Sequence, residues 1–139
     1  MGFELTIVTP DGESYRGSVD NVVLPGAEGD FGVLQKHECF LAPLRVGEVE
    51  IHAGDDRIFA AIASGFAAVT GEEVAVMVDS CELAHAIDTA RAEQARERAE
   101  QGLAAPKDPA EQSVERYKAA MERAHNRIAV SQKASGARS

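Results

Sequence analysis

The chain has 139 residues and a formal net charge of −9 at neutral pH, with a sequence pI near 4.9. No apolar run approaches the roughly 20 residues that a membrane-spanning helix needs. An acidic chain with no basic patch among aromatic residues also does not fit a general nucleic-acid-binding protein. The first residues enter a strand pattern without a basic segment, so no signal peptide is expected.

The character of the sequence changes near Leu83. Ten of the twelve glycines come before this point, between short runs rich in Val, Ile, Leu and Phe. Two segments rich in Ala, Glu and Arg follow it, separated by Gly102, Pro106 and Pro109. Short apolar runs between turn residues are typical of strands, and uninterrupted helix formers are typical of helices. We therefore predict an α+β chain, with an antiparallel β-sandwich or flattened barrel over residues 1–83 and an antiparallel two-helix hairpin over 84–139.

The strand prediction depends on alternation and on turn residues. Phe3, Leu5 and Ile7 alternate with polar residues, as a half-buried strand requires. Turns are expected at Pro10–Gly12, Gly54–Asp56 and Thr70–Glu73, and a glycine-rich bend at 26–32. Seven or eight short strands with no helix between them favour a sandwich or flattened barrel. The expected strands cover residues 3–7, 19–24, 33–34, 41–44, 46–52, 57–63, 65–69 and 74–78.

The two helices are expected at about residues 87–101 and 110–130. Apolar residues of the second helix recur at alternating spacings of three and four, namely Val114, Tyr117, Met121, Ala124 and Ile128. The first helix offers only a narrow stripe, composed of Ile87, Ala92, Ala95, Ala99 and Leu103. Because alanine buries little apolar area, we expect a weakly held hairpin that can open or exchange partners.

Charge is divided unequally between the two parts. Residues 1–83 hold 15 acidic residues and 4 Lys or Arg, a net charge of −11, whereas residues 84–139 carry +2. From residue 116 onward Glu122 is the single acid, against six basic residues: Arg116, Lys118, Arg123, Arg127, Lys133 and Arg138. Such a helix can be steered to an acidic protein surface or to phosphate, or can simply present a solvated face.

His37 is the centre of one candidate site. Glu38 and Cys39 adjoin it, and Glu28 and Asp30 lie in the preceding glycine-rich segment. The spacing matches no standard zinc pattern, so we expect neither a metal site nor a catalytic residue here. A loop that docks a partner is the preferred interpretation, and a small hydrolase centred on His37 ranks last. Cys39 and Cys81 are expected to be reduced thiols.

The hairpin holds a second candidate site. Asp88 suits the first turn of a helix, and it can pair with Arg91 or contribute to a nucleotide contact. Arg91 and Arg98 lie seven residues apart on one helix, and Arg123 and Arg127 are four apart on the other. If these faces converge, the four guanidinium groups make a cluster suited to a polyphosphate.

An ordered series of motifs gives the chain a family resemblance. In sequence order these are Gly26-x-x-Gly29-Asp30-Phe31-Gly32-Val33, His37, Leu44-Arg45-x-Gly47-x-x-x-Ile51, Ser64-Gly65-Phe66, Val74–Val78 with Asp79, and Ile87-Asp88-x-x-Arg91-Ala92. No single motif is specific, but the full set at this length resembles the epsilon subunits of F-type ATP synthases. The resemblance covers almost the whole chain.

This resemblance implies a non-catalytic central-stalk subunit that couples c-ring rotation to ATP synthesis and needs no cofactor. The implied partners are the gamma subunit, the c-ring and the alpha/beta catalytic hexamer. The implied location is the cytoplasmic side of the bacterial inner membrane, as a peripheral protein. Glu28, Asp30 and His37 match positions that dock on the c-ring. A basic face comprising Arg116, Lys118, Arg123 and Arg127 suits inhibition of ATP hydrolysis at an acidic segment of the beta subunit.

Some bacterial members of this family bind ATP as a regulatory ligand. The resemblance places such a site at Ile87, Asp88, Arg91, Ala92, Arg98, Arg123 and Arg127. A nucleotide-sensing regulatory module is therefore the alternative function, and it predicts tight ATP binding by the isolated chain.

Overall fold

The computed structural model describes residues 2–34, 39–104 and 113–136. Strands occupy the first part of this range and helices the second, with one short 3-10 turn between them. The strands are β1 (Phe3–Thr9), β2 (Gly12–Val19), β3 (Asn21–Gly26), β4 (Gly29–Leu34), β5 (Phe40–Leu44), β6 (Gly47–Ala53), β7 (Asp56–Ile62), β8 (Gly65–Val69), β9 (Glu73–Val78) and β10 (Cys81–Leu83). The 3-10 turn η1 (Ala84–Ala86) leads to α1 (Thr89–Ala104) and α2 (Ser113–Gly136).

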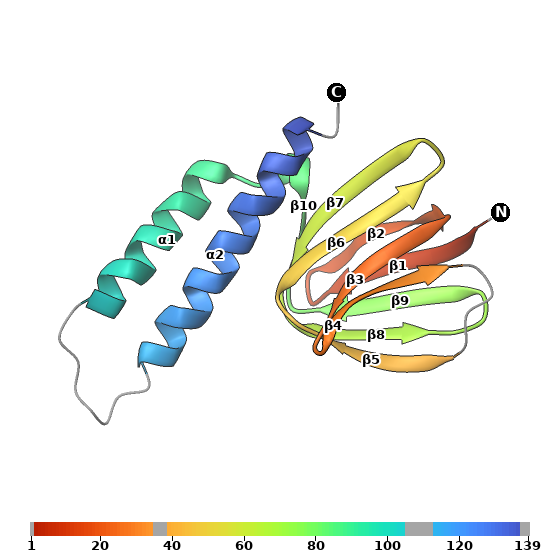
Figure 1. Cartoon of the computed structure of the whole chain (residues 1–139), viewed down its shortest axis with the longest axis horizontal. Helices are drawn as coiled ribbons and strands as arrows, with labels where there is room; N and C mark the ends of the chain where they lie inside the picture. Colours follow the sequence, from red (N-terminus) through yellow and green to blue (C-terminus); the bar gives the residue numbers. More distant parts are fainter. Residues whose placement is uncertain (1, 35–38, 105–112, 137–139) are drawn as a thin grey trace.

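The strands form one hydrogen-bonded sheet that folds over on itself. Its order is β10-β7-β6-β3-β5-β8-β9-β1-β2, and β4 pairs with β3 off this path. β1 runs parallel to β9, and the other paired strands are antiparallel. The predicted fold class, a sandwich or flattened barrel followed by a two-helix hairpin, is confirmed (Figure 1).

The sandwich encloses a core of its own. Alternate residues of its strands face inward, and Leu5, Ile7, Val22, Leu24 and Ile51 have no exposed surface. The whole buried cluster is drawn from the strands, without a residue from α1 or α2. The sandwich therefore does not need the hairpin to exclude water from its interior.

The first strands differ from the expected ones in two respects. No strand was expected over residues 13–18, but residues 12–19 form β2, which pairs with β1 alone at the end of the sheet. Its sequence is polar and only Val19 is buried, so no apolar alternation marks it. The glycine-rich bend at 26–32 is instead the β3–β4 hairpin, in which Gly29 has a φ of +143° that favours glycine.

The other two expected hairpin turns are confirmed. Gly54 has a φ of +63° at the β6–β7 turn. At the β8–β9 turn the Thr70 amide and hydroxyl both donate to the carbonyl oxygen of Glu73, at 2.9 and 3.1 Å.

The hairpin packs through small residues, as predicted. Ala92 and Ala99 of α1 and Ala124 of α2 are almost fully buried. A Cβ atom on Gly102 would lie only 2.4 Å from Cε1 of Tyr117, so glycine lets the aromatic ring approach α1 closely. Figure 1 shows α2 between α1 and the sandwich, with its C-terminal part nearest to β7 and its N-terminal end diverging from the sheet.

Gly65 offers a test of how tightly the sandwich is packed. A Cβ at this position would lie 2.1 Å from the Met77 carbonyl oxygen and 2.8 Å from Cα of Val78, whereas one on Gly71 meets nothing within 4 Å. Gly65→Ala should therefore lower the free energy of unfolding by about 1–3 kcal/mol, and Gly71→Ala should lower it far less. Urea denaturation of both variants measures this, and equal midpoints would contradict the packing described.

Candidate docking surfaces and the helix–sheet junction

The hairpin meets the sandwich at one small apolar cluster, here called the junction cluster. It comprises Phe59 and Ala61 of β7, Ala84 of η1, Ile87 just before α1, and Val130 of α2. Val130 is 1% exposed although it lies near the C-terminal end of the helix. The junction cluster is separate from the core of the sandwich, so each part keeps its own apolar interior.

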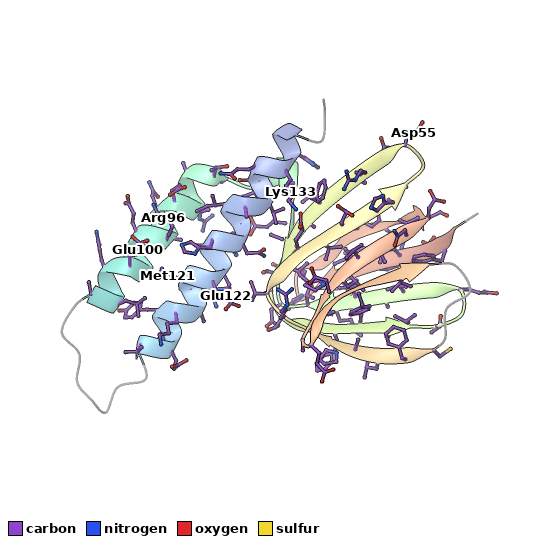
Figure 2. All side chains as sticks on the ribbon, in the orientation of Figure 1. Asp55, Arg96, Glu100, Met121, Glu122 and Lys133 are labelled. Atoms are coloured by element: carbon purple, nitrogen blue, oxygen red, sulfur yellow. The ribbon has the colours of Figure 1, made fainter. Side chains whose placement is uncertain are left out.

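Polar contacts surround the junction cluster. Arg127 Nε donates to Glu82 of β10, and Lys133 Nζ lies 2.7 Å from the carboxylate of Glu48 of β6. Asn126 Nδ2 donates to the carbonyl oxygen of Gly47 at 2.8 Å. Figure 2 shows Lys133 on the side of α2 that meets the sandwich. Three side chains of α2 are therefore engaged by the sheet.

Two cationic side chains, one from the sandwich and one from α2, lie over the Phe59 ring. Lys133 Nζ lies 5.2 Å from the ring centroid, and the Arg57 guanidinium lies 5.4 Å from it. Arg57 also pairs with Glu50, whose other carboxylate oxygen is 2.7 Å from His52 Nε2. The hydrogen bond with His52, together with Arg57, lowers the pKa of Glu50 despite partial burial. These contacts extend the polar contacts around the junction cluster along β6 and β7.

Two of the three predicted c-ring docking residues, Glu28 and Asp30, lie at the β3–β4 turn. Glu28 and Asp30 are exposed, and Asp30 pairs with the guanidinium of Arg45. Residues 26–31 line a recess of about 500 Å³ together with Ala42 and Pro43. His37 lies outside the described residues. The turn is therefore an acidic projection beside a shallow apolar recess.

A second exposed surface lies on β5, β8 and β9, along the lower side of the sandwich in Figure 1. Phe66 and Met77 are 51% and 45% exposed and stand opposite each other on adjacent strands. Leu41 of β5 is 65% exposed. Phe66 and Met77 line a groove of about 560 Å³ with Val8 and Pro43. We call Leu41, Pro43, Phe66, Met77 and Val8 the apolar strip.

The residues predicted to bind ATP fall in several environments. Asp88 is the N-cap of α1, because its carboxylate accepts from the Arg91 amide at 3.1 Å. Ile87 belongs to the junction cluster and Ala92 is buried on α1. Arg91 and Arg98 are exposed on α1. Arg123 and Arg127 instead line a small cavity between α2 and the sheet, together with Ser80 and Asn126.

The four residues of the basic face predicted on α2 also differ in their environment. Arg116, Lys118 and Arg123 are exposed, whereas Arg127 is half-buried and paired with Glu82. A shallow depression of about 380 Å³ runs along α2 between Arg116 and Arg123, lined also by Tyr117, Ala119 and Ala120. Three of the four residues therefore face solvent in this conformation.

The described residues contain no grouped metal ligands, and their two cysteines form no disulfide. Within residues 2–34, 39–104 and 113–136, no three His, Cys, Asp or Glu side chains are grouped to hold a metal ion. Both cysteines are free, and Cys39 is exposed. Burial raises the pKa of the Cys81 thiol to about 11, against a hydrogen bond with Ser14 that lowers it. Cys81 is therefore a neutral thiol at physiological pH.

Two family models match almost all of this sequence. The ATP synthase delta/epsilon chain β-sandwich domain matches residues 2–84, and the ATP synthase delta/epsilon chain long α-helix domain matches residues 85–132. The chain belongs to the ATP synthase delta/epsilon family. The resemblance inferred from the ordered motifs is thereby confirmed.

Individual members of the family agree over nearly their full length. An ATP synthase epsilon chain from Syntrophobacter fumaroxidans is 43% identical over 130 residues, which cover 94% of this chain and 96% of that one. One from Alkalihalophilus pseudofirmus is 42% identical over 106 residues, covering 76% and 80%. These relatives make the chain an epsilon-type ATP synthase subunit, a non-catalytic class and not a hydrolase centred on His37, and they do not favour the alternative of a nucleotide-sensing module.

Solved structures share the fold. A chain in the mitochondrial ATP synthase of Euglena gracilis, resolved with OSCP, F1 and the c-ring, superposes with a TM-score of 0.78 at 22% identity, covering 96% of this chain and 81% of that chain. A chain of the Tetrahymena thermophila mitochondrial central stalk and c-ring gives 0.59 at 15% identity, covering 96% of both. No helix among the described residues has the length and apolar character to cross a membrane.

Sequence reasoning missed the residues of the helix–sheet junction. Glu48, Glu82 and Lys133 have no local pattern that links them, because the paired residues are 45 and 85 positions apart. The one available signal was on α2, where Asn126, Val130 and Lys133 follow the helical spacing of four and three.

Asp88 tests whether the start of α1 depends on capping. Asp88→Ala removes the acceptor for the Arg91 amide and should destabilise the first turn of α1 by about 1 kcal/mol. Asp88→Asn keeps an acceptor oxygen and serves as the matched control. Hydrogen exchange at the amides of residues 90–93 should quicken in the alanine variant alone, and unchanged exchange there would refute the capping role.

Proposed function

We propose that this chain acts as the rotor subunit of the ATP synthase central stalk that connects the gamma subunit to the c-ring. It has no catalytic site of its own and couples rotation of the ring to ATP synthesis on the alpha/beta hexamer. The observation that supports this role most directly is the presence of two chemically different exposed surfaces on one self-contained sandwich. A rigid body with two such surfaces can transmit torque between two partners.

The apolar strip is the proposed surface for the gamma subunit. Apolar side chains exposed side by side on adjacent strands lose water-contacting area when a partner covers them, at about 25 cal/mol per Å². The two rows Pro43–Phe66–Met77 and Leu41–Ala68 lie in register across β5, β8 and β9. A continuous contact of this kind suits a permanent interface.

The β3–β4 turn is the proposed surface for the c-ring, with Glu28 and Asp30 as its contact residues, and His37, which lies outside the described residues, is the third residue proposed to contact the ring. Exposed carboxylates favour a partner that presents basic or hydrogen-bond-donating side chains. Arg45 pairs with Asp30 and partly neutralises its charge. Contact with the ring places the chain at the membrane surface as a peripheral protein, on the cytoplasmic side of the inner membrane of a bacterium.

The hairpin is the proposed regulatory part. Its exposed basic residues Arg116, Lys118 and Arg123, with Arg127 once its pair with Glu82 is broken, suit an acidic surface of the catalytic hexamer. Such binding would oppose rotation and inhibit ATP hydrolysis.

The gamma interface can be tested by charge substitution in the apolar strip. Met77→Glu should weaken binding to the gamma subunit about tenfold or more, because an unpaired carboxylate would be buried in the contact. Ala90→Glu, at an exposed site on α1, introduces the same charge away from the strip and should leave affinity unchanged. Surface plasmon resonance on purified gamma measures both, and equal affinities would disprove the assignment.

The ATP site implied by family resemblance remains a prediction that calorimetry can decide. That site requires the isolated chain to bind ATP with micromolar or tighter affinity and to lose this binding in Arg91→Ala. Arg96→Ala is the matched control, since Arg96 pairs with Glu93 and Glu100 within α1. The absence of binding up to millimolar ATP, or equal loss in both variants, would refute the site.

A further inference from the structure

The β3–β4 hairpin is attached to the rest of the sandwich near its base. The Arg45 amide donates to the Pro25 carbonyl oxygen at 2.9 Å, and the Ala27 amide donates to the Pro43 carbonyl oxygen at 3.0 Å. Beyond this point β4 pairs with β3 and with no other described strand. The turn and β4 therefore depend on side chains for any further attachment to the sandwich.

Arg45 supplies one such attachment, from the end of β5. Its guanidinium pairs with the carboxylate of Asp30 on β4. A second guanidinium nitrogen donates to the Val46 carbonyl oxygen at 3.3 Å. The backbone of Arg45 is held by β3 and its planar head group makes two contacts, so the side chain loses little further freedom in keeping the pair.

The two carboxylates of the turn differ in their charge environment. Both Glu28 and Asp30 are exposed, but Asp30 is paired with Arg45, whereas Glu28 makes no ion pair within the part of the chain that the structure describes. The pair of Arg45 with Asp30 is neutral as a unit. The turn therefore presents one uncompensated negative charge, on Glu28.

We propose that Arg45 is a positioning residue for the c-ring contact, which holds Asp30 and the β3–β4 turn so that Glu28 is the carboxylate that meets a basic or hydrogen-bond-donating group of the ring. The inference rests on the proposed docking role of this turn. An exposed ion pair adds little to the stability of the whole fold. A turn that is already ordered nevertheless avoids the entropic cost of ordering on binding.

The direction of the effect of Arg45 separates positioning from simple charge. Neutralising Arg45 makes the turn more negative, and long-range attraction alone would then strengthen its binding to a basic partner. A positioning role predicts weaker binding instead, because the freed turn must be ordered when it binds. The sign of the change in affinity therefore decides between the two.

The complex of the full chain with the gamma subunit provides the binding test, with purified c-ring as the partner in biolayer interferometry. Arg45→Gln should weaken binding about two- to fivefold. Glu28→Gln should weaken it about tenfold, through loss of a contact to a charged group. The exchange of Asp30→Arg with Arg45→Asp should restore most of the affinity that each single change loses. Arg16→Gln, which breaks an exposed ion pair with Glu13 on β2, is the matched control and should leave affinity unchanged.

Hydrogen exchange of the full chain without partners tests the positioning step separately. Amides of residues 28–32 should exchange about two- to fivefold faster in Arg45→Gln and in Asp30→Asn, because each variant loses the pair. The exchanged pair and Arg16→Gln should keep the original rates.

The proposal is overturned if Arg45→Gln binds the ring as tightly as the starting chain, or more tightly, while Glu28→Gln binds it more weakly. Unchanged exchange at residues 28–32 in Arg45→Gln would also overturn it. If neither Glu28→Gln nor Arg45→Gln alters ring binding, the docking role of the turn fails and the proposal fails with it. Faster exchange in that case would still show that Arg45 orders the turn, so the two failures are distinguishable.

Discussion

The junction cluster, which includes Val130 of α2 and Phe59 of β7, is the point at which the two parts of this molecule meet. Phe59 is buried, and the cationic groups of Lys133 and Arg57 lie about 5 Å from the centroid of its ring, as in cation–π contacts. Polar contacts surround this cluster, and they pair Arg127 and Lys133 of α2 with acidic residues of the strands. The position of the hairpin, and therefore the exposure of its basic residues, depends on this small contact.

The self-sufficiency of the sandwich explains why so small a junction is adequate. Its buried side chains come entirely from strands, so the hairpin is an attached body rather than a cover for the core. This separation leaves the outer strand surfaces free for partners. The apolar strip and the acidic β3–β4 turn lie on the sandwich, whereas the exposed residues of the predicted basic face, Arg116, Lys118 and Arg123, lie on α2. The acidic first part of the sequence thus corresponds to the sandwich, and the weakly basic second part corresponds to the helical hairpin.

Much of the fold could be predicted from the sequence because strand alternation and helical spacing are local signals. β1 is a clear case, with Phe3, Leu5 and Ile7 buried as expected. β2 escaped prediction because an edge strand with a polar sequence lacks that alternation. Phe66 and Met77 show a different limit. Their neighbours in sequence, Ala67 and Val78, face the core, so both point outward, and only the register of the strands places them side by side.

The candidate sites were harder to predict because they depend on long-range pairing. Asp88 was predicted in the first turn of a helix, but α1 begins at Thr89, so Asp88 precedes that turn and caps it. Arg127 was assigned to a basic face, but its partner Glu82 could not be identified from a pattern 45 residues away. A residue's type and local spacing therefore indicated its chemistry, whereas the contact that engages it required the fold.

Site-specific photocrosslinking in the intact ATP synthase would test the central-stalk role most directly. A photoreactive amino acid at Met77 would report the partner of the apolar strip, and one at Glu28 would report the partner of the β3–β4 turn. The account predicts a crosslink from position 77 to the gamma subunit and one from position 28 to the c-ring. Crosslinks from both positions to the same subunit, or to neither, would contradict a body that joins the two.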